Sequence, residues 1–236
     1  MKKFTNFQRM KNYRRFIPVL AFVMLFSCKS DPRQRKITSG RIDYKITYLN
    51  TNLDVKTLEL LPKEMKLLFD EKQAVNNIEG LLGFYKLDAI TDFHTRKCST
   101  LLKVFDKHYL FKGRRDEMMC CFDAMEEMEI RITEEKKTIA GFECTKALAL
   151  LPSAGDTIII YYTNDIELKH PNATNPYREI NGVLMEFELK LLYLKMRFTA
   201  EDYQSQTAEI GQAIFPKNTR FISRDQMTKL LNKLID

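Results

Sequence analysis

Five cysteines carry the most chemistry in this 236-residue sequence: Cys28, Cys98, Cys120, Cys121 and Cys144. Thiols of proteins that leave the cytoplasm pair as disulfides, although buried cysteines are also common as thiols. The four cysteines after Cys28 allow three pairings among which spacing does not choose, and Cys98–Cys144 is our candidate disulfide. The adjacent Cys120 and Cys121 would point to opposite faces of a strand, one buried and one exposed.

The histidines predict neither a catalytic nor a metal site. A metal could take ligands from His94, Cys98, Cys120 and Cys121, but their spacing matches no zinc framework. His94, His108 and His170 have no nucleophile in a known pattern, and His170 lies in a loop rich in Pro and Asn. We therefore predict no catalytic residue, no metal and no cofactor, and expect that the protein is not an enzyme.

An acidic stretch could supply paired carboxylates or calcium ligands. It consists of Asp123, Glu126, Glu127, Glu129, Glu134 and Glu135. The residue order of a calcium loop is missing, and Lys136 and Lys137 follow at once. The pattern favours a solvated face.

The N-terminus has the three parts of an export signal in their usual order. Residues 1–15 are basic, residues 16–26 are apolar apart from Pro18, and Ser27 and Cys28 follow. The apolar run would span about 16 Å as a helix, which is too short for the ~30 Å hydrocarbon core of a bilayer. The pattern therefore predicts a cleaved signal peptide over residues 1–27.

Leu25, Ser27 and Cys28 resemble a bacterial lipobox, in which a small residue directly precedes the cysteine. The resemblance implies cleavage between Ser27 and Cys28 and attachment of lipid, palmitate included, at Cys28. The alternative is an ordinary secretory peptide with an unrelated cysteine. Acyl chains contribute about 0.8 kcal/mol per buried methylene, so several would hold the protein on the membrane.

The predicted organisation is then a polar tether over residues 28–36 and a single domain over residues 37–236. The expected location is the cell envelope, at the outer membrane, on its periplasmic or surface face.

Charge argues against a nucleic-acid partner. The whole chain has a formal net charge of +7, but six of its 38 basic residues lie in residues 1–27, which contain no acid. Removing them leaves 32 basic and 31 acidic residues. A protein that neutralises phosphates needs a standing excess of cations.

The domain begins with a strand and continues with a short helix. Residues 41–49, RIDYKITYL, alternate polar with apolar or aromatic residues, as a half-buried antiparallel strand does. Leu58, Leu61, Met65 and Leu68 recur at helical spacing, with Pro62 near the start, which predicts a helix over residues 62–70.

Strand patterns dominate residues 73–208. Residues 97–105 and 108–113 predict a hairpin, residues 157–163 a central strand buried on both faces, and residues 185–198 two alternating strands.

The chain ends in a helix with clear start signals. Ser223 and Gln226 form a capping box, and Ile222 and Met227 a hydrophobic staple. An apolar stripe follows at Met227, Leu230, Leu231 and Leu234. Together these elements predict an α+β fold, in which helices near residues 62–70 and at the C-terminus pack on a curved antiparallel half-barrel sheet.

Several stretches resemble an uncharacterised group of Bacteroidetes-type envelope lipoproteins akin to the GLPGLI family. The family's opening G-x-I-x-Y strand is GRIDY at residues 40–44, and its middle motif is KTIAGFECTKA at residues 137–147. A strand ending in YTNDI follows at residues 162–166, and a strand GVLMEF at residues 182–187.

Proteins of this group resemble the lipoprotein-carrier superfamily, a curved half-open sheet whose concave side is covered by helices. The resemblance implies a concave face that holds acyl chains, with the helices at 62–70 and 224–235 as lid or plug. We therefore expect the protein to bind a lipid or an acylated protein. The alternative is a non-catalytic interaction module in a complex of outer-membrane proteins, with its cavity filled by side chains.

Overall fold

The computed structural model describes residues 36–49, 54–122, 125, 127–151, 155–205, 210 and 215–235. The predicted signal peptide and nearly all of the predicted tether lie outside these residues. Residues Lys36–Asp236 form one unit by themselves.

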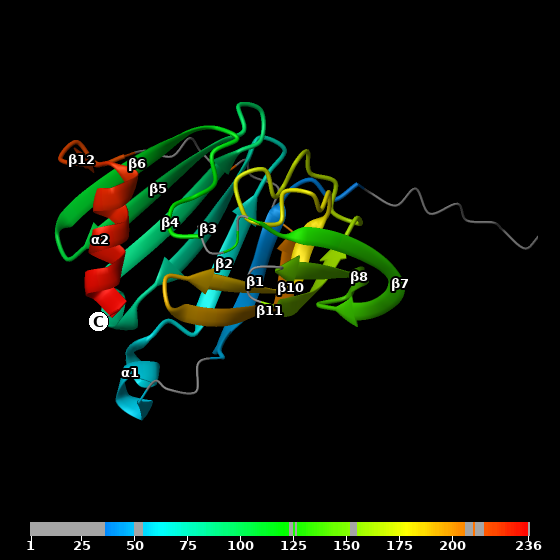
Figure 1. Cartoon of the computed structure of the whole chain (residues 1–236). Coiled ribbons are helices and arrows are strands. Elements are labelled where there is room, and N and C mark those ends of the chain that lie inside the picture. Colours follow the sequence, from blue (N-terminus) through cyan, green and yellow to red (C-terminus); the bar gives the residue numbers. More distant parts are fainter. Residues whose placement is uncertain are drawn as a thin grey trace, which may run out of the picture. The chain divides into compact units, whose positions relative to one another are not determined.

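One sheet of twelve strands dominates the described part of the chain (Figure 1). Its strands are β1 (Gly40–Tyr48), β2 (Glu64–Phe69), β3 (Gln73–Glu79), β4 (Tyr85–Asp92), β5 (Lys97–Val104), β6 (Lys107–Arg115), β7 (Glu129–Ile139), β8 (Phe142–Leu151), β9 (Asp156–Thr163), β10 (Val183–Leu191), β11 (Leu194–Ser205) and β12 (Arg220–Phe221). The helices are α1 (Val55–Leu60) and α2 (Arg224–Ile235), with a 3-10 turn at Leu81–Gly83.

The sheet order is β12-β6-β5-β4-β3-β2-β1-β11-β10-β9-β8-β7. Neighbouring strands are antiparallel except β12, which runs parallel to β6. The sheet is large, open and curved, and the helices are few (Figure 1). A curved antiparallel sheet is therefore confirmed, whereas the α+β label is too coarse for a fold that is mostly β.

Strand β1 confirms the alternation in the sequence. Ile42, Tyr44 and Ile46 are buried, and the residues between them face outward. The strand lies in the middle of the sheet, between β2 and β11. The two predicted hairpins also form, as β5–β6 and β10–β11. Strand β9, predicted to be central, lies inside the sheet but only third from the β7 edge, and Ile159 is 45% exposed, so burial on both faces is not complete.

The predicted helix over residues 62–70 is wrong. A helix does form just before it, at α1, where the Asp54 side chain caps the backbone N–H of Thr57. Pro62 follows the end of α1, and the residue before a proline disfavours helical backbone. Residues 64–69 then pair with both β1 and β3, because Met65, Leu67 and Phe69 also alternate as a strand requires.

Helix α2 confirms the start signals read from the sequence. The backbone N–H of Ser223 donates to Gln226 Oε1 at 3.0 Å, and the N–H of Gln226 donates to Ser223 Oγ at 3.3 Å. Met227 and Leu231 are buried against β5 and β6 residues such as Leu102 and Phe111. None of the helices in the described part is long and apolar enough to cross a membrane.

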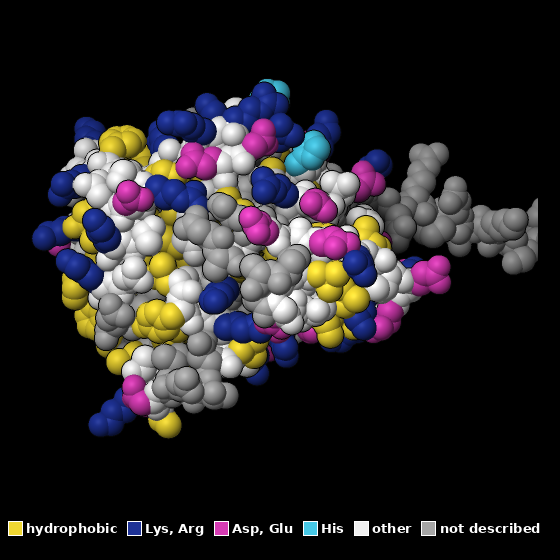
Figure 2. Space-filling view, in the orientation of Figure 1, with side chains coloured by type: hydrophobic (Ala, Val, Ile, Leu, Met, Phe, Trp, Pro, Cys, Tyr) yellow, Lys and Arg dark blue, Asp and Glu magenta, His cyan; other side chains and the backbone are white. Residues whose placement is uncertain are grey.

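Exposed apolar side chains gather at one end of the sheet. Nine large apolar side chains of the described residues are exposed, and six of them lie in connections at the end where β1 finishes and β2 begins. These six, which we call the apolar end, are Val55, Leu60, Leu82, Phe84, Phe105 and Tyr193. In Figure 2, apolar side chains appear at several places on the face shown, and a small one lies beside charged side chains at the bottom of the view, near α1.

Candidate ligand-binding pocket

A pocket lies between the sheet and the segments that cover it. Strands β2–β5 supply one wall, through residues such as Leu67, Asn76 and Ala89. Strands β10 and β11 supply another, and Leu231 of α2 and the segments around Cys120 and Asn172 close it further. The space between atoms in and around it is about 1130 Å³, which includes open solvent beyond its mouth, so the hollow itself is smaller.

Small side chains on the wall explain why there is a hollow here. Across β3, β4 and β5, Asn76 pairs with Ala89 and Ala89 pairs with Thr100. One row further along, Ala74 pairs with Thr91. Larger side chains at these positions would fill the space, since protein interiors are otherwise packed without voids larger than a water molecule.

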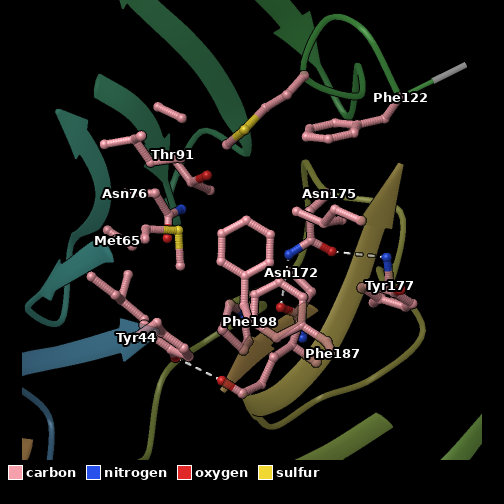
Figure 3. A pocket seen from close by; sticks show the side chains of 18 of the residues that line it. Tyr44, Met65, Asn76, Thr91, Phe122, Asn172, Asn175, Tyr177, Phe187 and Phe198 are labelled. Carbon is pink, nitrogen blue, oxygen red and sulfur yellow. Dashed lines mark hydrogen bonds between the residues drawn. The ribbon is translucent and has the colours of Figure 1, made fainter. Parts of the chain in front are cut away.

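The described lining carries no charge. None of the 27 described residues that line the pocket is Asp, Glu, Lys, Arg or His. Most of them are aliphatic or aromatic, with Phe187 near the centre of the view in Figure 3. The Phe187 ring stacks on Phe198 at 5.1 Å between centroids and meets the edges of Tyr44 and Tyr177 at 5.9 and 6.2 Å.

Most polar groups of the lining are bonded to other parts of the protein. The Tyr44 hydroxyl donates to the carbonyl of Leu184 at 2.7 Å, and the Tyr177 hydroxyl donates to the carbonyl of Glu188. Burial raises the pKa of both phenols, so they stay neutral. The Thr91 hydroxyl lies 2.7 Å from that of Thr174.

Asn172 fixes the loop that covers the pocket. Its side-chain amide donates to the carbonyls of Ile180 at 2.7 Å and Gly182 at 2.9 Å, and its Oδ1 accepts from Asn175 Nδ2 at 2.9 Å. Figure 3 shows Asn172, Asn175 and Tyr177 on one side of the pocket and Asn76 on the other. In the sequence this loop stands out only as a Pro- and Asn-rich segment around His170, because spacing does not reveal which amides become buried.

Asn76 and Thr100 differ from the other polar residues of the lining. Neither side chain has a hydrogen-bond partner within the described residues. Both lie on the wall of β3–β5, on either side of Ala89. The side-chain amide of Asn76 and the hydroxyl of Thr100 are therefore available to form hydrogen bonds with a ligand in the pocket. Neither residue could be identified from the sequence. What brings them together is the pairing of β3, β4 and β5, and no sequence motif marks that pairing.

The cysteines of the domain carry thiols, and all four are buried. Cys98 on β5 and Cys144 on β8 belong to separate hydrophobic clusters, on strands that are not neighbours in the sheet. The structure therefore does not bring our candidate pair together.

Cys120 and Cys121 lie in a turn, not in a strand. Cys121 has a φ of 77°, and the two Sγ atoms are 3.1 Å apart. The alternation expected for a strand therefore does not apply, and both cysteines are buried. Contact with Cys121 and burial raise the pKa of the Cys120 thiol, which lines the pocket in its neutral form.

The other candidates do not converge on a site. His94 and His170 are exposed in turns, and His108 is half-buried on β6. No group of three or more His, Cys, Asp or Glu in the described residues could hold a metal ion.

The described part of the acidic stretch lies mainly along β7. Glu129 pairs with Arg131 at 2.9 Å, and Glu135 accepts from Lys146 and from Tyr161. These two hydrogen bonds lower the pKa of the Glu135 carboxyl. Strand β7 is the edge of the sheet and mostly exposed, so this is a solvated face. Asp123 and Glu126, like Ser27 and Cys28, lie outside the described residues.

Comparison with known proteins yields likeness of fold alone. No family model matches the chain, and no curated protein matches it significantly in sequence. Among solved structures, PNGF-II is similar at a TM-score of 0.53 and 13% identity, over 83% of this chain. The chain spans about a third of the length of PNGF-II, with 33% of that protein covered.

A second solved structure, LprF from Mycobacterium bovis, matches at a TM-score of 0.30 and 11% identity, over 75% of this chain and 90% of LprF. A TM-score at that level carries no argument about fold or function. The resemblance to the GLPGLI group stays a prediction. What PNGF-II supports is the β-rich architecture.

Proposed function

We propose that this protein is a lipid-anchored envelope lipoprotein whose pocket binds the apolar chain of a lipid or of an acylated protein. The observation that carries the proposal is an open, uncharged hollow lined mainly by aliphatic and aromatic side chains. Pockets of this kind, apolar with a few placed polar groups, are typical of small-molecule sites. Burial of a hydrocarbon chain there would gain ~25 cal/mol per Å² of apolar surface.

The location is supported by the N-terminal sequence. In this proposal residues 1–27 are removed on export, the Cys28 thiol is acylated, and the protein stays on the outer membrane through that anchor. The role is binding rather than catalysis, and it needs no cofactor.

The test is to fill the hollow from its wall. Ala89→Phe places a ring between Asn76 and Thr100, and Ala89→Leu is a milder version in case the first variant does not fold. The readout is saturable fluorescence of N-phenyl-1-naphthylamine, an uncharged apolar dye, with the purified domain. We expect dye affinity to fall by at least about tenfold, because the new side chain at position 89 occupies the space in which the dye would bind.

Leu101→Phe is the matched control. Leu101 lies next to Thr100 on β5 and therefore points to the opposite face of the sheet. The Leu101→Phe substitution adds a ring outside the hollow, so dye affinity should stay within about twofold of that of the unmodified protein. Absence of saturable dye binding to the unmodified protein, or equal binding by folded Ala89→Leu protein, would contradict the proposal.

The apolar end favours a second candidate, an interaction module in an outer-membrane complex. Phe84 and Phe105, whose rings are 5.6 Å apart, are 51% and 65% exposed there. Exposed apolar patches mark sites of interaction with proteins or membranes. Loss of co-purification with an outer-membrane protein in a Phe84→Ser/Phe105→Ser variant, with dye binding unchanged, would support this role.

A further inference from the structure

Asn76, Ala89 and Thr100 form a single row across three strands. Ala89 pairs with Asn76 on one side and with Thr100 on the other, and all three line the pocket. The small methyl group of Ala89 leaves open space between the amide and the hydroxyl. Figure 3 shows the Asn76 amide beside Thr91 and Met65 on the wall of the hollow.

The two polar side chains of this row have no partner within the described residues. Their neighbours differ in this respect: Asn172, Tyr44 and Thr91 are each bonded to another part of the protein. In the unliganded pocket water can serve Asn76 and Thr100. A hydrocarbon that covered them would remove that water and leave both groups unpaired, which is costly in an apolar site.

Charge on the ligand is disfavoured for a separate reason. The described residues of the pocket lining contain no cation that could pair with a carboxylate or phosphate, and no anion that could pair with an amine. An ion buried there would lose its hydration without compensation. The group that meets Asn76 and Thr100 must therefore form hydrogen bonds and carry no net charge.

The pocket is also polarised along the strands. Asn76 and Thr100 lie toward the middle of the wall and Thr91 lies toward its opposite end, whereas Ile78 and Leu87 lie toward the apolar end and Leu191 faces the hollow there. A ligand with one polar group and one chain fits this order, with its polar group at Asn76 and its chain over Ile78 and Leu87.

We propose that the pocket selects uncharged amphiphiles, whose ester, amide or hydroxyl group bonds to Asn76 and Thr100, over fatty-acid anions of the same chain length. This inference rests on the proposed function and names the ligand class of the same site. An amide side chain and a hydroxyl each offer a donor and an acceptor, so a carbonyl or a hydroxyl of the ligand can be met.

The experiment compares two ligands with one acyl chain, 1-monolauroylglycerol and laurate, as displacers of N-phenyl-1-naphthylamine at pH 8. We expect monolauroylglycerol to displace the dye at about tenfold lower concentration than laurate. The variant is Asn76→Leu/Thr100→Val, which keeps the volumes and removes the hydrogen bonds. Its affinity for monolauroylglycerol should fall by about tenfold, with affinity for the dye unchanged.

Ser99→Val is the matched control, because Ser99 neighbours Thr100 on β5 but faces the other side of the sheet. It should keep the full preference. Equal displacement by the two ligands in the unmodified protein overturns the inference, and so does unchanged affinity for monolauroylglycerol in the double variant. If the dye itself does not bind, the proposed function fails first. A dye that binds with no preference between displacers defeats only the inference.

Discussion

Asn172 holds the covering loop to the start of β10 through its two donated hydrogen bonds. Asn172→Ala removes both and leaves the buried carbonyls of Ile180 and Gly182 without a donor. We expect the free energy of unfolding to fall by about 2–3 kcal/mol, because orphaned buried polar groups cost more than the bond that is lost. Urea denaturation monitored by circular dichroism measures this.

Asn218→Ala is the control for that variant, since Asn218 is exposed in a turn. Its effect should stay within about 0.5 kcal/mol. Equal stability of the two variants would show that the amide of Asn172 does not fix the loop.

The buried thiols predict a loss of stability in alkali. Burial raises the pKa of Cys98 and of Cys144 to about 11, from an ordinary value of 9.0. The unfolded chain therefore ionises these thiols first. Their contribution to stability is complete below about pH 9 and is lost as the pH rises toward about 11.

Urea denaturation at a series of pH values, with reductant present, checks this expectation. A Cys98→Ala/Cys144→Ala variant should be less stable at pH 8 but should lose less stability between pH 9 and about 11. Parallel curves for the two proteins would refute the assignment of the alkaline loss to these thiols.

At the scale of elements, α2 depends on its capping box. Ser223→Ala removes the oxygen that accepts from the Gln226 N–H, and we expect a loss of about 1 kcal/mol in the free energy of unfolding. Ser223→Asp keeps an acceptor at this position and should restore most of that loss. If the alanine and aspartate variants are equally stable, the cap contributes nothing measurable.

The difference between α2 and β2 shows which elements the sequence can predict. For α2 the cap, the staple and the apolar stripe all agree, and each depends on residues within one turn of another. For residues 64–69, helical spacing through Met65 and Leu68 competed with alternation through Met65, Leu67 and Phe69. Pairing with β1 and β3 makes this segment a strand. That pairing involves residues distant in the sequence, so a short stretch of sequence does not reveal it.

At the scale of the whole molecule, the N-terminal sequence predicts how the protein is held. Cys28→Ser should abolish lipid attachment and release any form that has lost its leader from the membrane fraction, because the proposed site of acylation is this thiol. Fractionation with a mass measurement of the N-terminus checks this. A serine variant that stays membrane-bound with its leader removed would refute anchoring through Cys28.

The pocket could be predicted only in part. Long apolar residues on alternating positions predict a concave apolar face, and that much can be read from a single chain. The hollow itself arises where Asn76, Ala89 and Thr100 fall into one register across β3, β4 and β5. No local pattern fixes that register, so the position of the hollow and its two unpartnered polar groups emerge only with the assembled sheet.

The described chain joins the sheet opposite the apolar end. Lys36 bonds to Glu167, Ile37 bridges to Ile166, and β1 then starts at Gly40, whereas Phe84 and Phe105 lie beyond the far ends of the strands. In the proposed lipid-anchored protein, the chain therefore enters the domain at the end of the sheet opposite the exposed phenylalanines. An acyl chain bound over Ile78 and Leu87, as proposed, would lie nearer to the end of the sheet at which the chain does not enter.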